Sequence, residues 1–154
     1  MRFILIDTIL ELEPGKRITA SKVLPTSEEL FRDHFPGFPV VPGVILTEMM
    51  AQAAGRCLDA EGTHPGRAML GKINGASFRE WVKPDQEIRL HATITQNRSS
   101  FATAECFAEV EGKRVCSAGL FFVFTPHERF AEGHQDEVLL AYWRNHPEKQ
   151  PKTR

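Results

Sequence analysis

The segment from Val44 to Ala60 constrains the fold more than any other part of this 154-residue chain. Its residues would be apolar around almost the whole circumference of a helix. The exception is one narrow polar stripe at Glu48, Gln52, Arg56 and Asp59, spaced by four, four and three. A helix of this composition is buried on most sides rather than lying on a surface. The chain must therefore supply other elements that enclose it.

The segments on both sides of this helix are typical of β-strands. Residues 87–95 and 101–110 alternate between two faces, and one face of the second segment carries only Ala102, Ala104, Cys106, Ala108 and Val110. Such small residues are expected where a helix lies close against a sheet. Further strands are predicted at 2–12, 17–24, 68–82 and 114–124, with bulges or bends at Gly71 and Gly75. We therefore predict an α+β fold, with an antiparallel sheet wrapped around one long central helix.

Composition narrows the function classes. The formal net charge of −1 argues against a nucleic-acid-binding protein, which would normally be basic. No stretch approaches the ~18 apolar residues of a membrane-spanning helix, so no membrane span is expected. The three cysteines lack a CxxC pair and are interpreted as reduced core thiols of a cytoplasmic protein.

A stiff loop at residues 33–43 leads directly into the apolar helix. It contains three prolines and two glycines, which forbid regular structure. Just before it, Thr26 and Glu29 form a capping-box pattern that predicts a short helical turn through Phe31.

Three residues at or near this loop are candidates for chemistry, each with a structural alternative. Glu48, in apolar surroundings, is a candidate general acid, although Arg56 and Asp59 favour a solvent-exposed stripe at the far end of the helix. His34 is a candidate base, although a lone histidine is more often structural. Gly43 would leave backbone N–H groups free at a helix N-terminus, although Pro-Gly is also an ordinary helix entry.

Other common chemistries find no support in the sequence. No His/Cys/Asp/Glu group has the spacing of a metal site. Neither GxSxG nor GxxxxGK[ST] occurs, so a serine nucleophile and a phosphate-binding loop are not indicated. We expect no metal and no cofactor.

The motif His34-Phe35-Pro36-Gly37-x-Pro39-x-x-Pro42-Gly43-Val44, followed by Glu48-x-Met50-Ala51-Gln52-Ala53-Ala54-Gly55, resembles that of the β-hydroxyacyl-[acyl-carrier-protein] dehydratases of fatty acid synthesis, which have the hotdog fold. The separation of 14 positions between the histidine and the glutamate agrees with that family. A glutamate at position 48 is similar to its non-isomerising branch.

This resemblance implies a function and an assembly. It implies dehydration of (3R)-3-hydroxyacyl thioesters on acyl carrier protein to trans-2-enoyl thioesters, with His34 and Glu48 as catalytic residues. Substrate would be bound by Val40, Gly43, Val44 and Gln52; the Val40 carbonyl would accept from His34, and Gln52 would orient Glu48. The implied assembly is a homodimer, or a trimer of dimers, in which His34 of one chain faces Glu48 of the other.

The resemblance also implies a division of the chain and leaves two other functions open. Residues 1–125 correspond to the dehydratase-like domain, and residues 126–154 form a partly helical C-terminal extension with an amphipathic stretch at 136–144. Candidate cations for docking an acidic carrier protein are Arg67, Lys72, Arg79 and Lys83. The alternatives are a hotdog acyl thioesterase, in which Glu48 activates water or attacks the carbonyl, and a non-catalytic acyl-binding subunit.

Overall fold

The structure is a computed structural model that describes residues 1–151. Its helices and strands follow the order expected for a sheet interrupted by one long helix. They are β1 (Thr8–Glu13), β2 (Arg17–Val23), α1 (Leu30–Asp33), α2 (Gly43–Glu61), β3 (Gly66–Phe78), β4 (Glu87–Asn97), β5 (Phe101–Val110), β6 (Lys113–Pro126), the 3₁₀ turn η1 (His127–Arg129), α3 (Glu137–Asn145) and the 3₁₀ turn η2 (Pro147–Lys149).

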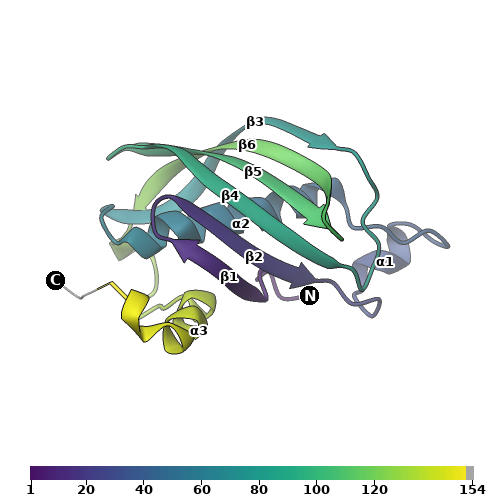
Figure 1. The fold of residues 1–154 in the computed structure, drawn as a ribbon, viewed down its shortest axis with the longest axis horizontal. Helices are drawn as coiled ribbons and strands as arrows, with labels where there is room; N and C mark the ends of the chain where they lie inside the picture. The colour runs from purple at the N-terminus through teal and green to yellow at the C-terminus, as the bar shows by residue number, and fades with distance from the viewer. Residues whose placement is uncertain (152–154) are drawn as a thin grey trace.

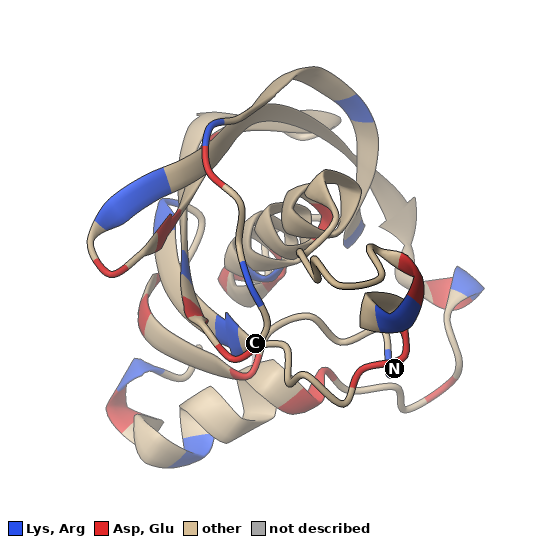
Figure 2. Ribbon diagram, turned by 90° about the vertical axis from the view of Figure 1, so that its right-hand side faces the viewer, with Lys and Arg blue, Asp and Glu red and all other residues tan. Residues whose placement is uncertain are grey.

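All six strands belong to one antiparallel sheet with the order β1-β2-β4-β5-β6-β3 (Figure 1). The predicted irregularities in β3 are present as register shifts between Leu70 and Lys72 and between Ile73 and Gly75. The sheet curves around α2, which Figure 2 shows nearly end-on inside the curved ribbon. This arrangement is the predicted α+β architecture.

Burial explains why α2 is apolar all round. Met49, Met50, Ala54, Cys57 and Leu58 are fully buried on this helix. The small face of β5 is buried as well, with Ala102, Ala104 and Ala108 no more than 1% exposed. Small side chains on the strand therefore face the helix, as the alternation predicts. Among residues 1–151, no helix has both the length and the apolar composition needed to cross a membrane.

The C-terminal segment packs back on the sheet. Asp136 is the N-cap of α3, and its side chain accepts hydrogen bonds from the N–H groups of Val138 and Leu139. The buried face of α3 includes Tyr142 and Trp143, and the helix lies against the edge strand β1 (Figure 1). One edge of the sheet is therefore covered by the chain itself.

The other edge, β3, is open. This strand pairs only with β6, and every residue from Met69 to Phe78 is exposed. Several of these exposed side chains are large and apolar, namely Met69, Leu70, Ile73 and Phe78. An open edge with apolar side chains is a surface that proteins usually cover.

Three local predictions are wrong. The first strand begins at Thr8 rather than Arg2, and the third ends at Phe78 rather than Val82. The capping box at Thr26 does not form: α1 begins after Glu29 without a side-chain cap. Instead, Thr26 donates its hydroxyl and N–H to the Asp85 carboxylate, which holds the pKa of that carboxyl below its usual value.

Candidate active site

The loop between α1 and α2 holds His34 in one orientation. The Nδ1 atom of His34 lies 3.0 Å from the carbonyl oxygen of Val40, and the ring stacks on Phe35 at a centroid distance of 4.0 Å. Because a carbonyl oxygen only accepts, Nδ1 must carry the hydrogen. In the neutral ring, Nε2 then has the free lone pair. The expected contact between His34 and Val40 is therefore present.

Backbone hydrogen bonds make this loop rigid. Phe35 and Phe38 donate to each other's carbonyl oxygens, at 3.0 and 2.9 Å, and the N–H of Val40 donates to the carbonyl of His34 at 3.0 Å. The N–H of Val41 donates to the Val82 carbonyl at 2.7 Å, which fixes the loop to the segment after β3. The His34–Phe35 peptide bond is cis.

The N-terminus of α2 presents free backbone donors. Among residues 1–151, the N–H groups of Gly43 and Val44 find no acceptor, as is usual in a first helical turn. An added Cβ at Gly43 would lie 3.0 Å from the ring of Phe78, so a larger residue here would require that ring to shift. Val44 is 76% exposed, so this turn is open to solvent in the single chain.

Glu48 and Gln52 meet one turn apart on α2. The Nε2 atom of Gln52 donates to Oε1 of Glu48 at 3.1 Å, as predicted. The other carboxyl oxygen, Oε2, has no hydrogen-bond partner among residues 1–151. The side-chain oxygen of Gln52 accepts from the N–H of Leu5 at 2.9 Å, which ties α2 to the N-terminal segment.

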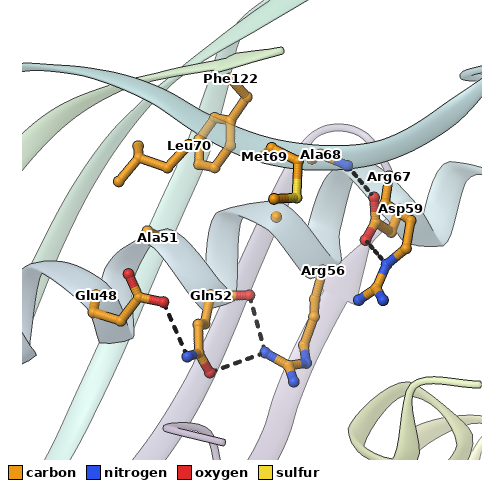
Figure 3. Close-up of a pocket in the computed structure, with 11 residues that line it drawn as sticks. Glu48, Ala51, Gln52, Arg56, Asp59, Arg67, Ala68, Met69, Leu70 and Phe122 are labelled. Atoms are coloured by element: carbon orange, nitrogen blue, oxygen red, sulfur yellow. Dashed lines mark hydrogen bonds and ion pairs between the residues drawn. The ribbon is translucent and has the colours of Figure 1, made fainter. Parts of the chain in front are cut away.

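A groove of about 320 Å³ runs along α2 beneath β3 (Figure 3). Glu48 and Gln52 lie at one end. The middle is lined by small or apolar residues, which include Ala51, Gly55, Met69, Leu70 and Phe122. Such a groove suits an extended apolar chain whose reacting end lies beside the Glu48 carboxyl group.

Charged side chains close the far end of the groove. Asp59 lies 3.6 Å from Arg67 and accepts from the N–H of Ala68 at 2.8 Å. Arg56 lies 3.2 Å from Asp136, which is also 3.9 Å from Arg67. Burial raises the pKa of the Asp59 carboxyl, and the Ala68 N–H and the Arg67 guanidinium partly oppose that shift.

These contacts correct two expectations. Arg56 and Asp59 are not a solvent-exposed stripe, since their side chains are only 12% and 17% exposed. Arg67 is not a free docking cation, because it pairs with Asp59 and Asp136 and lies over the ring of Phe130. Lys72, Arg79 and Lys83 are exposed, as the docking prediction requires.

A single chain does not bring every predicted residue together. Gln52 and Glu48 line the groove, whereas His34 does not, and within residues 1–151 His34 makes no hydrogen bond to Glu48. No group of three His, Cys, Asp or Glu side chains in this range is arranged to hold a metal ion.

Sequence reasoning missed Asp136 and Phe78 as neighbours of the site. Asp136 contacts Arg56 across 80 positions of the chain, and Phe78 lies over Gly43 from the end of β3. The only signal for Asp136 was its place as a helix-capping residue before the amphipathic stretch. No pattern in a single sequence pointed to Phe78.

The chain is similar in sequence to known proteins over most of its length. A family model of the FabA-like domain matches residues 1–119. The 3-hydroxyacyl-[acyl-carrier-protein] dehydratase FabZ of Pediococcus pentosaceus is 43% identical over 119 residues, which cover 77% of this chain and 80% of that protein. FabZ of Listeria monocytogenes is 36% identical over 124 residues, 80% of this chain and 86% of that protein.

Solved structures share the fold at much lower identity. The Streptococcus mutans protein smu.793, bound to acetyl CoA, superposes with a TM-score of 0.65 at 10% identity, over 82% of this chain and 94% of that one. A hypothetical thioesterase with coenzyme A from Streptococcus pneumoniae superposes with a TM-score of 0.62 at 12% identity, over 77% and 85%. These two likenesses concern the fold alone.

Proposed function

The chain belongs to the FabA-like family and is a dehydratase of 3-hydroxyacyl thioesters on acyl carrier protein, and from this premise we propose that His34 and Glu48 carry out the reaction. The product is a trans-2-enoyl thioester, an intermediate of fatty acid synthesis. The observation that supports these roles most directly is the hydrogen bonding of the two side chains. His34 keeps Nε2 free and Glu48 keeps Oε2 free.

His34 is the general base in this proposal. The hydrogen bond from Nδ1 to the Val40 carbonyl leaves Nε2 of the neutral ring unprotonated. This nitrogen takes the α-proton of the substrate, which is weakly acidic because it is adjacent to the thioester carbonyl. The rigid loop avoids reorganisation of the base during the transfer.

Backbone N–H groups stabilise the charge that this transfer creates. Removal of the α-proton puts negative charge on the thioester oxygen. The free N–H of Gly43, together with that of Val44, stands at the positive end of α2 and donates to this oxygen. Gly43 and Val44, with the Val40 carbonyl and Gln52, form the substrate-binding set.

Glu48 is the general acid. Gln52 donates to Oε1, so in the protonated carboxyl group the hydrogen lies on Oε2, the oxygen without a partner. As the bond between the β-carbon and the hydroxyl breaks, this proton passes to the hydroxyl, which leaves as water. The electron pair from the α-carbon forms the new double bond. His34 then holds one proton and Glu48 has lost one, and exchange with solvent restores both.

We propose a homodimer because one chain does not join His34 to Glu48. The open edge of β3 is a surface on which a second copy of this strand could pair. Its exposed apolar side chains, together with Val44 and Trp81, would be covered by the partner. In this dimer, His34 of one protomer faces Glu48 of the other.

The exposed cations Lys72, Arg79 and Lys83 are the proposed docking residues for the acidic carrier protein.

We propose that the dehydratase unit comprises residues 1–125, which include the whole sheet apart from Pro126, and that residues 126–154 are an extension.

The test is hydration of a trans-2-enoyl thioester, the reverse reaction, followed by loss of the enoyl absorbance. We expect wild-type protein to be active, and His34→Ala and Glu48→Gln each to lower kcat by at least about 10²-fold with little change in Tm. Near-wild-type turnover by either variant would remove these roles. Release of free thiol in a parallel assay would instead favour the thioesterase alternative.

A further inference from the structure

The side-chain amide of Gln52 uses all of its hydrogen-bonding capacity. Its Nε2 donates to Glu48 at 3.1 Å and to the Phe3 carbonyl at 3.1 Å. Its Oε1 accepts from the Leu5 N–H at 2.9 Å and from Nη1 of Arg56 at 3.4 Å. An amide group offers two hydrogens and two lone pairs, so no site is left unused.

This pattern fixes which end of the amide faces Glu48. Arg56 and the N–H of Leu5 can only donate, and the Phe3 carbonyl can only accept. If the amide were flipped, all of these contacts would be lost and Oε1 of Gln52 would face Glu48. The carboxyl proton would then be held between Glu48 and Gln52 instead of lying on the oxygen that faces the groove.

Arg56 is held in turn by the C-terminal segment. Its Nε donates to Asp136 at 3.2 Å, and the two side chains are 12% and 14% exposed. Among residues 1–151 this is the most shielded pair of a carboxylate with an arginine, a lysine or the N-terminal amine. Asp136 also caps α3, so one carboxylate both begins the C-terminal helix and orients the guanidinium.

We propose that Arg56 and Asp136 are positioning residues for the dehydration, and that the C-terminal segment, through Asp136 and Arg56, helps to hold the Gln52 amide in the orientation that keeps the Glu48 proton on Oε2. Figure 3 shows Glu48, Gln52 and Arg56 following one another along α2. Asp136 lies beyond residues 1–119, which the family model matches. The inference rests on the proposed function of Glu48 as the acid.

Two substitutions separate the positioning role from simple stability. Asp136→Asn keeps a good N-cap for α3 but removes the charge that holds Arg56. Arg56→Lys keeps a charge opposite Asp136 but loses the planar fork that also reaches Gln52. The matched control is Glu137→Gln, which lies in the same helix and breaks only the exposed pair with Arg2.

We expect Asp136→Asn and Arg56→Lys each to lower kcat by about five- to tenfold. With the Gln52 amide held less firmly, fewer molecules would keep the Glu48 proton on Oε2. KM should stay within twofold, because neither residue belongs to the proposed substrate-binding set. The control variant Glu137→Gln should leave both kcat and KM unchanged. Measuring Tm for each variant identifies any loss of folded protein, which would lower the apparent kcat without this mechanism.

A double-mutant cycle with Gln52→Ala gives the decisive readout. Because the effect of Asp136 passes through Gln52, Asp136→Asn should lower kcat less than twofold in the Gln52→Ala background. An equal loss of kcat in both backgrounds, or no loss in the single variants, would overturn the inference while the wild-type activity stands. Absence of dehydratase activity in the wild type, or full activity of Glu48→Gln, would instead overturn the proposed function.

Discussion

At the scale of single residues, Gly43 combines a backbone donor with a close approach to another side chain. Its N–H is a proposed donor to the thioester oxygen, and its missing side chain leaves room for the ring of Phe78, 3.0 Å from where a Cβ would lie. A side chain would push the ring or the helix start, and the donors would shift. Because Phe78 is 46% exposed, its ring can shift, and the close approach therefore costs little stability.

We predict that Gly43→Ala lowers kcat by at least about tenfold. The loss should stay below the about 10²–10³-fold that follows complete removal of an oxyanion donor. Steady-state kinetics on a short enoyl thioester measures this effect, and Tm should change by only a few degrees. If the contact with Phe78 is the cause, adding Phe78→Ala should restore part of the activity. A Gly43→Ala variant with wild-type kcat would contradict the role of these N–H groups.

Burial also decides how reactive the three cysteines are. All three are free and buried, and burial raises the pKa of Cys57 and Cys106 to about 12 and that of Cys116 to about 11. Because the thiolate is the reactive form, a raised pKa suppresses reaction with disulfide reagents.

We therefore predict that native protein shows no fast-reacting thiol up to about pH 9, and that three thiols appear after denaturation. A colorimetric disulfide reagent, added with and without guanidinium, makes the comparison directly. One thiol that reacts quickly in native protein would show that the core around it opens readily.

At the scale of helices and strands, periodicity predicted most of the sheet. The predicted strand at residues 101–110 has the same bounds as β5. Its strict alternation is typical of a strand, and the small side chains on one face indicate that this face packs against a helix. The start of β1 was not predictable: residues 3–6 are as apolar as a strand, but Leu5 donates its N–H to the Gln52 side chain instead. The Thr26 pattern failed because Asp85, 59 positions away, takes the hydrogen bonds of Thr26.

The site was predictable only where its contacts are local. The hydrogen bond between His34 and Val40 spans six positions, and that between Gln52 and Glu48 spans one helical turn. The Arg56 contact depends on how the tail folds back, so sequence spacing alone suggested a solvent-exposed side chain. Long-range ion pairs leave no periodic signal in a single chain.

The groove beside α2 gives a prediction at this scale. Gly55 lies in the helix, lines the groove, and has no atom closer than 3.9 Å to an added Cβ. Gly55→Ala should therefore raise the free energy of unfolding by about 0.5–1 kcal/mol, as alanine favours helix. The added methyl group narrows the groove, so kcat/KM should fall for long acyl chains and stay unchanged for short ones.

Denaturant unfolding and a chain-length series of 3-hydroxyacyl thioesters test both effects. Ala51→Gly is the opposite change on the same wall: it should destabilise the helix and leave long chains well accepted. Equal losses for short and long chains in Gly55→Ala would mean that the acyl chain does not lie along this part of α2.

At the scale of the whole molecule, the chain covers one edge of its sheet and leaves the other edge exposed. The chain covers β1 with α3, whereas β3 leaves its backbone and its apolar side chains open over Met69 to Phe78. The apolar side chains of Phe35, Phe38, Val44 and Trp81 are exposed as well. Pairing through β3 would remove this apolar surface from water, and in the proposed dimer it would bring His34 of one protomer to Glu48 of the other.

A site shared between protomers has a consequence that mixing experiments detect. We predict that His34→Ala and Glu48→Gln, inactive alone, regain about a quarter of wild-type activity after co-refolding in equal amounts, since half of the dimers are mixed and each mixed dimer has one intact site. Wild type mixed with the double variant should likewise keep about a quarter, against about half for sites within one chain. No recovery in the first mixture, with half the activity kept in the second, would place both groups in one protomer and exclude the shared site.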